Sequence, residues 1–405
     1  MELYVNKNEC YGCGACQNAC ALGAITMQAD EEGFLYPVIN ADLCIDCGKC
    51  KKACQIYNVA EREGIEPLVF AGKNKDEEVR ARSTSGGIFS VFAKEIIQNE
   101  GAVYGVAFDE QFHILHERAE TAEGYEKFLG SKYAQSKIGD VYQQVKNDLL
   151  ENRQVLFSGT PCQNAGLATY LGKLAESENL ILCEIICHGA PSPLMWQEHI
   201  AFIEKERKSK VVAYKNRSKV AGWHAHNEHF FLENGKNEYK SKLAQNHKDL
   251  FYAHLTIRPS CYKCEYTSFP RIADITIADY WGIELCMKEF DDNKGTSLLI
   301  LNTAKAEVFF ERVKDKIELR ESNLEDAFRD NHKKPAKMNV NREAFWRDYH
   351  KNGYAYVLRK YSAYSKRGRA KRWLKFKTKA IIQKIGIYKF VHKFTQRKYQ
   401  KDTYK

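Results

Sequence analysis

Eight cysteines near the start of the chain form two identical runs. The first run reads C-x-x-C-x-x-C-x-x-x-C over residues 10–20, and the second repeats it over residues 44–54, with every cysteine 34 residues after its counterpart. Two intervening residues let successive thiolates converge on one metal centre, and glycines inside both runs let the backbone wrap closely around it. Structural zinc sites do not need triplets repeated in tandem. The repeat therefore predicts a duplicated module, residues 1–60, that holds two 4Fe–4S clusters.

This module resembles the bacterial two-cluster ferredoxins, in which the fourth cysteine of each run ligates the other cluster. The resemblance implies that the ligands of one cluster are Cys10, Cys13, Cys16 and Cys54. It implies that the ligands of the other cluster are Cys44, Cys47, Cys50 and Cys20. The proline that usually follows the fourth cysteine is replaced by Ala21 in the first run and by Gln55 in the second. We expect this departure to affect the stiffness of the turn more than ligation.

The rest of the composition supports metal ligation over disulfide bonding. The chain has 405 residues and 14 cysteines. No stretch approaches the roughly 18 apolar residues of a membrane-spanning helix. The N-terminus lacks the basic and then apolar run of a secretory signal, so we expect a cytoplasmic protein. Thiols stay reduced in that compartment, where clustered cysteines usually bind metal.

Strands and helices alternate after a short charged linker at residues 61–66. The hydrophobic pattern predicts strands over residues 68–72, 103–108, 155–157, 180–187 and 272–280. It predicts a helix with Ile88, Phe92 and Ile96 on one face, and further helices after Pro161 and near Pro193. Segments 211–216 and 223–232 look like an antiparallel addition. The expected fold class is α+β, in which a ferredoxin-like two-cluster module precedes a mixed-sheet α/β flavin and iron–sulfur domain and a basic helical tail. The expected boundaries are 1–60, 66–150, 151–320 and 321–405.

A first chemical motif, Arg82-Ser83-Thr84-Ser85-Gly86-Gly87, stands immediately before the helix that starts near Ile88. Hydroxyls and glycine amides at a helix N-terminus suit an anionic phosphate, because unpaired N–H groups and the helix dipole point at it. The motif matches neither G-x-G-x-x-G nor the P-loop. Its structural alternative is an ordinary helix cap.

Further cysteines mark two more motifs. Cys162, in Gly159-Thr160-Pro161-Cys162-Gln163, stands at a helix start, which favours the thiolate. Pro-Cys-Gln also surrounds the nucleophile of cytosine methyltransferases, but no glycine-rich cofactor loop supports that interpretation. Cys261-x-x-Cys264 suits zinc, a redox pair or no function, and beside Cys162 and Cys187 it offers a four-thiolate site. Cys183 and Cys286 lie in apolar patterns and are predicted to be core.

Several of these stretches together resemble the coenzyme F(420) hydrogenase/dehydrogenase beta-subunit family over about residues 66–310. The motifs that carry the resemblance are Ser85-Gly86-Gly87, Gly130-Ser131-Lys132-Tyr133, Gly159-Thr160-Pro161-Cys162, Cys187-His188-Gly189, Cys261-x-x-Cys264 and Ala278-Asp279-Tyr280-Trp281-Gly282. The family includes the coenzyme-reducing subunit of archaeal hydrogenases, formate dehydrogenase beta subunits and plant hydroxymethyl-chlorophyll reductase. Its members also include fusions with an N-terminal two-cluster ferredoxin.

The resemblance implies an FAD-binding domain with an additional 4Fe–4S cluster. The implied cluster ligands are Cys162, Cys187, Cys261 and Cys264. The implied flavin contacts are Ser83, Ser85, Gly86, Gly87, Ser131, Lys132 and Tyr133. Lys132 is the candidate catalytic residue, because a cation near the anionic pyrimidine edge of the flavin stabilises its reduced form. A solvated surface charge is the alternative for this lysine.

Two functions fit these features. The first is an iron–sulfur flavoprotein oxidoreductase that passes electrons between 4Fe–4S clusters and FAD, and to or from a small substrate or soluble carrier, which is deazaflavin-like in relatives. A flavin suits this role because it converts between one-electron and two-electron transfer. The second is a non-catalytic electron-transfer subunit of a larger redox complex. Either one has a redox partner protein or a soluble electron carrier. The sequence names neither the substrate nor the direction of electron flow.

The C-terminal tail is strongly basic. Residues 366–405 contain fifteen Lys and Arg side chains and one acidic residue, Asp402. Trp373, Phe376 and Phe394 are among the apolar residues that recur there at helical spacing, which predicts a basic amphipathic helix. Such a helix suits peripheral contact with the anionic inner face of a membrane, and its alternatives are docking on its own domain or on an acidic partner. Nucleic acid is not expected, because no recognition module accompanies the charge.

Three histidines occur in the predicted strand 223–232, namely His224, His226 and His229. Histidines that alternate along a strand share one face of the sheet and can ligate a metal. The alternative is that they are ordinary surface residues of the strand. We expect the second of these.

Overall fold

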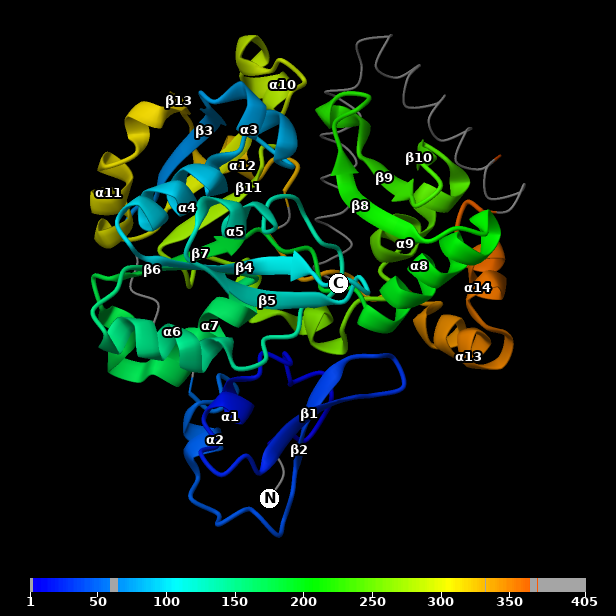
Figure 1. Ribbon diagram of the computed structural model, residues 1–405, viewed down its shortest axis with the longest axis horizontal. Helices are drawn as coiled ribbons and strands as arrows, with labels where there is room; N and C mark the ends of the chain where they lie inside the picture. Colours follow the sequence, from blue (N-terminus) through cyan, green and yellow to red (C-terminus); the bar gives the residue numbers. More distant parts are fainter. Residues whose placement is uncertain (1–2, 59–64, 332, 365–369, 371–405) are drawn as a thin grey trace. The chain divides into compact units, whose positions relative to one another are not determined.

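The computed structural model describes residues 3–58, 65–331, 333–364 and 370. The chain divides into two compact units, residues 1–342 and residues 343–405. The first unit contains an N-terminal module and an α/β body, and Figure 1 shows the module beside one end of the body. The second unit is helical where it is described. The expected α+β class with a ferredoxin-like N-terminus and a mixed sheet is confirmed.

The N-terminal module repeats one short design. An antiparallel pair of strands, β1 (Ile25–Ala29) and β2 (Leu35–Ile39), connects two one-turn helices, α1 (Ala15–Asn18) and α2 (Lys49–Lys52). Each helix carries the third cysteine of its run. Each follows a glycine with a positive φ, +73° at both Gly14 and Gly48. Glycine suits both positions because residues with a Cβ atom rarely adopt this left-handed backbone conformation.

The body is built on a mixed sheet. In the described part of the chain this sheet has eight strands in the order β13-β3-β12-β11-β7-β6-β4-β5. Its strands β4, β6, β7 and β11 are parallel to one another, and all other pairings are antiparallel. The strand bounds are β3 Leu68–Asn74, β4 Ala102–Phe108, β5 Ile114–Ala119, β6 Val155–Gly159, β7 Leu180–Ile185, β11 Ile275–Asp279, β12 Ser297–Leu301 and β13 Ile317–Glu321. The predicted strands are confirmed, with two differences in their bounds. Strand β11 begins at Ile275 and not at residue 272, and β7 ends two residues earlier than expected, which leaves Cys187 in the following loop.

Helices cover both faces of this sheet (Figure 1). Successive residues of β6 point to opposite faces, so Leu156 packs with α4 and α11 while Phe157 packs with α6 and α7. Both residues are fully buried. The helix bounds are α3 Glu77–Arg82, α4 Ile88–Gln98, α5 Ala122–Glu126, α6 Val141–Leu150, α7 Pro161–Leu171, α10 Ile283–Cys286, α11 Ala304–Glu311 and α12 Leu324–Ala327. The predicted helices after Ile88 and Pro161 are confirmed.

A smaller antiparallel sheet extends the body. Its strands are β8 (Val211–Ser218), β9 (Asn227–Leu232) and β10 (Asn237–Tyr239), and its helices are α8 (Pro193–Arg207) and α9 (Lys242–Tyr252). The expected antiparallel addition and the helix near Pro193 are therefore confirmed. The predicted strand at 223–232 is too long, because residues 223–225 form a turn of 3₁₀ helix instead.

This turn separates the three histidines. His224 lies in the 3₁₀ helix, and His226 follows it with a φ of +50°. Only His229 lies on β9, where it is buried and contacts Ser218 and Asn237 through its ring nitrogens. The expectation of three surface histidines along one strand is therefore wrong. The cause is the turn, which the alternating sequence pattern does not reveal.

The described part of the second unit contains the helices α13 (Arg342–Asn352) and α14 (Tyr354–Tyr361). Arg342, the first residue of α13, is also the last residue of the first unit. The predicted basic helix at 366–405 lies outside the described residues. Among the residues that are described, no helix has the length and hydrophobicity to cross a membrane.

Candidate cofactor cavity and cluster sites

Four thiols of the N-terminal module surround a cavity of about 20 Å³. They belong to Cys10, Cys13, Cys16 and Cys54, the set that the ferredoxin resemblance assigns to one cluster. Burial raises the pKa of Cys13 to about 12, and the neighbouring thiols of Cys10 and Cys54 add to this effect. The first three cysteines of one run thus lie beside the fourth cysteine of the other run.

The remaining thiols of the module lie around α2. Burial raises the pKa of Cys50, and nearby Cys44 and Cys47 raise it further. Cys20 packs in a small apolar cluster with Cys16 and Cys50. Because this cluster joins cysteines of both runs, the assignment of Cys20 to the second cluster stays a prediction.

All fourteen cysteines lie in the described part of the chain, and none of them forms a disulfide. Reduced cysteines that cluster in this way commonly ligate metal.

The module packs directly on the body around the site of Cys10, Cys13, Cys16 and Cys54. The Gln55 side chain donates from Nε2 to the carbonyl of Cys162 at 2.9 Å. A Cβ atom on Gly166 of α7 would lie 2.8 Å from Cys13 Sγ, so only glycine admits the thiol this close. The side chain at the position of the missing proline thus links the module to the helix that carries Cys162. Sequence reasoning assigned no role to Gln55.

Arg258 joins the module to the body from the other side. Its guanidinium is 1% exposed and donates to the carbonyls of Cys10 at 2.8 Å and Leu35 at 3.0 Å. It also donates to Gln135 Oε1 at 2.9 Å and lies over the Tyr36 ring. Sequence reasoning missed this residue, because nothing in its neighbourhood marks a buried arginine.

A larger cavity of about 350 Å³ opens in the body at the carboxyl ends of β6 and β7. Four cysteines from three separate segments line it: Cys162, Cys187, Cys261 and Cys264. Cys162 lies in the first turn of α7, which follows β6, and Cys187 follows β7. Because β6 and β7 are adjacent and parallel, their carboxyl ends meet at one edge of the sheet. The last two cysteines arrive on a 3₁₀ helix, Pro259–Lys263, and the residue after it.

These four thiols lie close enough to raise one another's pKa. Burial raises the pKa of Cys162, and the thiols of Cys264, Cys187 and Cys261 raise it further. Burial likewise raises the pKa of Cys261 to about 11. Ser260, which directly precedes Cys261, lines the same cavity. Its buried hydroxyl has no hydrogen-bond partner among the described residues. Cys183 lies in the core as predicted, and Cys286 is partly buried.

The predicted flavin contacts lie on another wall of the same cavity. Six of the seven residues line it: Ser83, Ser85, Gly87, Ser131, Lys132 and Tyr133. Thr84 connects the two segments, because its Oγ1 accepts from the Ser131 amide at 2.8 Å. The α4 helix begins here at Gly87, and no side chain caps its first amides. Uncapped amides at a helix start suit an anionic group.

Gly86 is the exception. Its amide donates to Ser297 Oγ at 2.9 Å, and its carbonyl accepts from the Asn74 amide at 2.8 Å. A Cβ atom there would lie 2.3 Å from the Gly72 carbonyl oxygen. Gly86 therefore permits the close packing of the loop on β3 and β12 and does not face the cavity.

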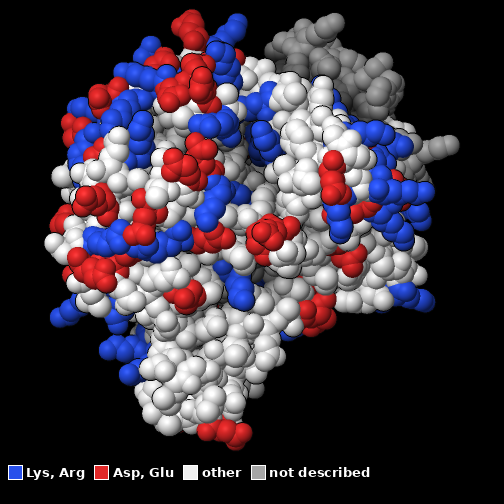
Figure 2. All heavy atoms as spheres, in the orientation of Figure 1, with Lys and Arg blue, Asp and Glu red and all other residues white. Residues whose placement is uncertain are grey.

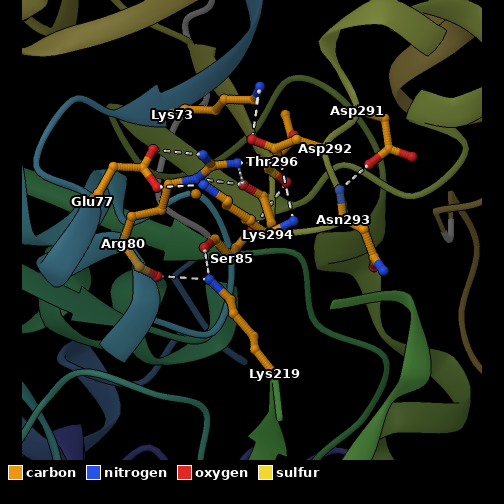
Figure 3. Close-up of polar contacts among 12 residues, drawn as sticks. Lys73, Glu77, Arg80, Ser85, Lys219, Asp291, Asp292, Asn293, Lys294 and Thr296 are labelled. Atoms are coloured by element: carbon orange, nitrogen blue, oxygen red, sulfur yellow. Dashed lines mark hydrogen bonds and ion pairs between the residues drawn. The ribbon is translucent and has the colours of Figure 1, made fainter. Parts of the chain in front are cut away.

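Polar contacts hold this loop from outside the cavity (Figure 3). Lys219, at the end of β8, donates to the carbonyls of Arg80 at 2.7 Å and Ser85 at 2.6 Å. Arg80 in turn pairs with Asp292 at 2.6 Å, and Ser85 Oγ donates to the Thr296 carbonyl at 2.8 Å. The serine hydroxyl is thus occupied by the protein itself. The α4 amides, not this hydroxyl, remain available to an anion.

Lys132 is positioned by backbone carbonyls. Its ammonium donates to the carbonyls of Lys127 at 2.7 Å and Leu129 at 3.1 Å. Desolvation lowers the pKa of Lys132 from 10.5 to about 7, and Glu117 partly opposes this effect. The lysine thus changes its charge near neutral pH at the cavity wall.

A third wall was not assigned by sequence reasoning. Arg217 Nη1 donates to Asp279 Oδ2 at 2.7 Å, and the guanidinium lies 4.8 Å from the centre of the Trp281 ring. All three residues line the cavity, as does Tyr252. Asp279 and Trp281 belong to a motif of the family resemblance, which was the available signal.

Comparison with known proteins follows the same division. Residues 9–57 match the 4Fe-4S dicluster domain, and residues 152–327 match the family described as the C terminus of the coenzyme F420 hydrogenase/dehydrogenase beta subunit. A chain in the xenon-derivatised F420-reducing NiFe hydrogenase complex from Methanosarcina barkeri is 15% identical, over 62% of this chain and 81% of that chain, with a TM-score of 0.43. No curated protein matches the chain. The chain therefore carries a 4Fe–4S dicluster domain at residues 9–57 and, over residues 152–327, is similar to the coenzyme F420 hydrogenase/dehydrogenase beta-subunit family.

Proposed function

We propose that the chain is an FAD-dependent iron–sulfur oxidoreductase that exchanges electrons with a small substrate or a soluble carrier. One observation carries this proposal: a single cavity is lined both by four cysteines and by an uncapped helix N-terminus beside a lysine. Its volume of about 350 Å³ lies in the range of small-molecule sites. A pocket that shares a wall with a cluster site suits electron exchange between the two.

The cofactors would be held by groups already described. A third 4Fe–4S cluster would take Cys162, Cys187, Cys261 and Cys264 as its ligands. The phosphates of FAD would lie at the amides that begin α4, with Ser131, Lys132 and Tyr133 on the adjoining wall. The unpartnered Ser260 hydroxyl offers a further hydrogen bond. Bound FAD supplies the conversion between one-electron and two-electron transfer.

Metal and flavin content test this proposal. Anaerobic reconstitution should yield three clusters, about twelve irons per chain, together with about one FAD. Replacing Cys261 and Cys264 by serine should lower the iron content to about eight and leave the dicluster module intact. Cys286→Ser is the matched control, because Cys286 lies outside the cavity lining, and it should retain all the iron. Zinc as the dominant metal, or full iron content in the double variant, would contradict the proposal.

The isolated protein also distinguishes this function from that of a non-catalytic electron-transfer subunit. Under the proposal, FAD binds and a two-electron donor reduces the clusters through it. A protein that holds its clusters but neither binds FAD nor turns over with any hydride donor would instead be an electron-transfer subunit.

A further inference from the structure

The two halves of the dicluster module have different surroundings. In the first half, a Cβ atom on Gly14 would lie 3.5 Å from Ile138 of the body, and Cys13 contacts Gly166. In the second half, the equivalent Gly48 has open space around it, and Cys47 is exposed. The cluster site of the second run is therefore the one that faces solvent.

Exposed apolar side chains surround this outer site. Ile45, between Cys44 and Cys47, is 71% exposed, and Leu43 is 48% exposed. Leu22, two residues after Cys20, is 53% exposed. We call these three residues, together with Cys47 and the helix α2, the distal surface. Apolar side chains gathered at one exposed place commonly mark a protein interaction site.

The positive charge of the distal surface is concentrated on helix α2. Helix α2 and its flanks expose Lys49, Lys51 and Lys52. The preceding loop exposes Asp42 and Asp46, so the helix side is basic while the loop side is acidic. Figure 2 shows that the visible face of the module is otherwise mostly uncharged. An apolar patch beside a basic helix fits an acidic protein partner.

We propose that the distal surface docks an acidic electron-carrier protein. This inference rests on the proposed function, because it assigns the entry point of the electrons that the cavity uses. Each encounter moves one electron, so that one partner is oxidised as the other is reduced. Two encounters account for the two electrons that FAD holds. A small contact area is sufficient, because interfaces between redox proteins are typically small and transient.

Charge reversal on α2 tests the docking surface. We choose Lys51→Glu with Lys52→Glu, and an acidic plant-type ferredoxin serves as the probe. The double variant should react with the reduced ferredoxin about tenfold or more slowly at low ionic strength, and the difference should shrink as salt screens the charges. The dissociation constant measured by titration should rise in parallel. Lys94→Glu with Lys236→Glu makes the same charge change at exposed positions of the body, and it should leave both quantities unchanged.

Further measurements separate this inference from the proposed function. Iron, FAD content and the rate of reduction by dithionite should be the same in the double variant as in the wild type. If these hold and ferredoxin reacts equally fast with both proteins, the docking surface is refuted while the proposed function stands. Equal slowing in the control variant would also refute it, because net charge alone would then explain the effect. Ile45→Ser should slow the reaction at all salt concentrations, and an unchanged rate would count against the apolar contact.

Discussion

Gly12 and Asp46 occupy equivalent positions, 34 residues apart, and both have a positive φ, +65° and +52°. Aspartate is among the few residues that tolerate this conformation. In the second half Asp46 is exposed to solvent. In the first half a Cβ atom would lie 2.6 Å from the Arg258 guanidinium and 2.9 Å from the Leu35 carbonyl oxygen. Packing on the body, and not the loop conformation, therefore demands glycine at position 12.

This contrast predicts the effect of alanine at two glycines. Gly12→Ala should lower the free energy of unfolding by about 2–4 kcal/mol, because left-handed strain and a clash with Arg258 add together. Gly48→Ala should cost about 1 kcal/mol, because strain acts alone in open space. Chemical denaturation of the reconstituted protein measures both. Equal losses in the two variants would show that the module does not pack on the body through Gly12.

The lowered pKa of Lys132 predicts that the stability of the protein depends on pH. Its pKa is about 7 in the folded protein, whereas an ordinary solvated lysine has a pKa of 10.5. Between these values the unfolded chain binds more protons than the folded one, so this lysine makes stability rise with pH over that window. Lys132→Met should remove the rise, and its stabilising effect should be largest below pH 7. Urea unfolding of both proteins from roughly pH 6 to pH 9 measures the difference. Parallel curves would mean that the lysine is ordinarily charged in the fold.

At the scale of elements, the turn between α3 and α4 combines two tasks. Its inner side, Gly87 and the first amides of α4, lines the cavity. Its outer side is fixed by Lys219 and by the loop that precedes β12. Gly86 lies between them, against the backbone of β3. The family motif Ser-Gly-Gly thus contains one glycine for the cavity side and one for packing.

Alanine substitutions distinguish these two tasks. Gly86→Ala should strongly destabilise the protein, by about 3 kcal/mol or more, because its Cβ atom would meet backbone atoms of β3 and β12 that have no room to move. Gly130→Ala, at the cavity but with its nearest neighbour 4.0 Å away, should cost only about 1–2 kcal/mol of left-handed strain. Thermal unfolding compares the two variants. A mild effect of Gly86→Ala would indicate that this turn moves away from β3 in solution.

At the scale of the first unit, Arg258 is the main polar link between the module and the body. Several contacts support it, including Asn18 Nδ2 with the Gly139 carbonyl at 2.8 Å and Arg342 Nη1 with Glu32 Oε1 at 2.8 Å. Such links keep the thiols of the first run beside α7. The buried guanidinium also satisfies acceptors that would otherwise lie unpaired away from water.

Removing Arg258 should loosen the module without emptying its clusters. Arg258→Ala leaves buried carbonyls unsatisfied and should cost about 3–5 kcal/mol. Amides of the module should then exchange hydrogen faster than amides of the central sheet. Arg258→Lys is the control that retains the charge but not the planar fork, and it should recover part of the protection. Unchanged exchange in Arg258→Ala would show that the remaining contacts hold the module alone.

What the sequence by itself determined is local in origin. The cysteine runs specify two cluster sites because three of the four ligands of each site lie within a few residues of one another, and hydrophobic periodicity indicated the order of strands and helices. The 3₁₀ turn at residues 223–225 escaped this pattern, because a short irregular turn has no period. The family motifs indicated candidate residues but not which of them line the cavity, because that depends on the packing of distant segments.

Only the tertiary structure decided which residues meet. Cys162 and Cys187 share a cavity because parallel pairing of β6 and β7 brings the loops that follow these strands to one edge of the sheet. Cys264, about a hundred positions after Cys162, reaches the same cavity on a separate segment. The roles of Gln55, Gly86 and Arg258 depend likewise on neighbours far away in sequence. The asymmetry of the two duplicated halves arises in the same way. Identical ligand patterns become an inner and an outer site because Cys13 lies against Gly166 of the body, whereas its counterpart Cys47 is exposed.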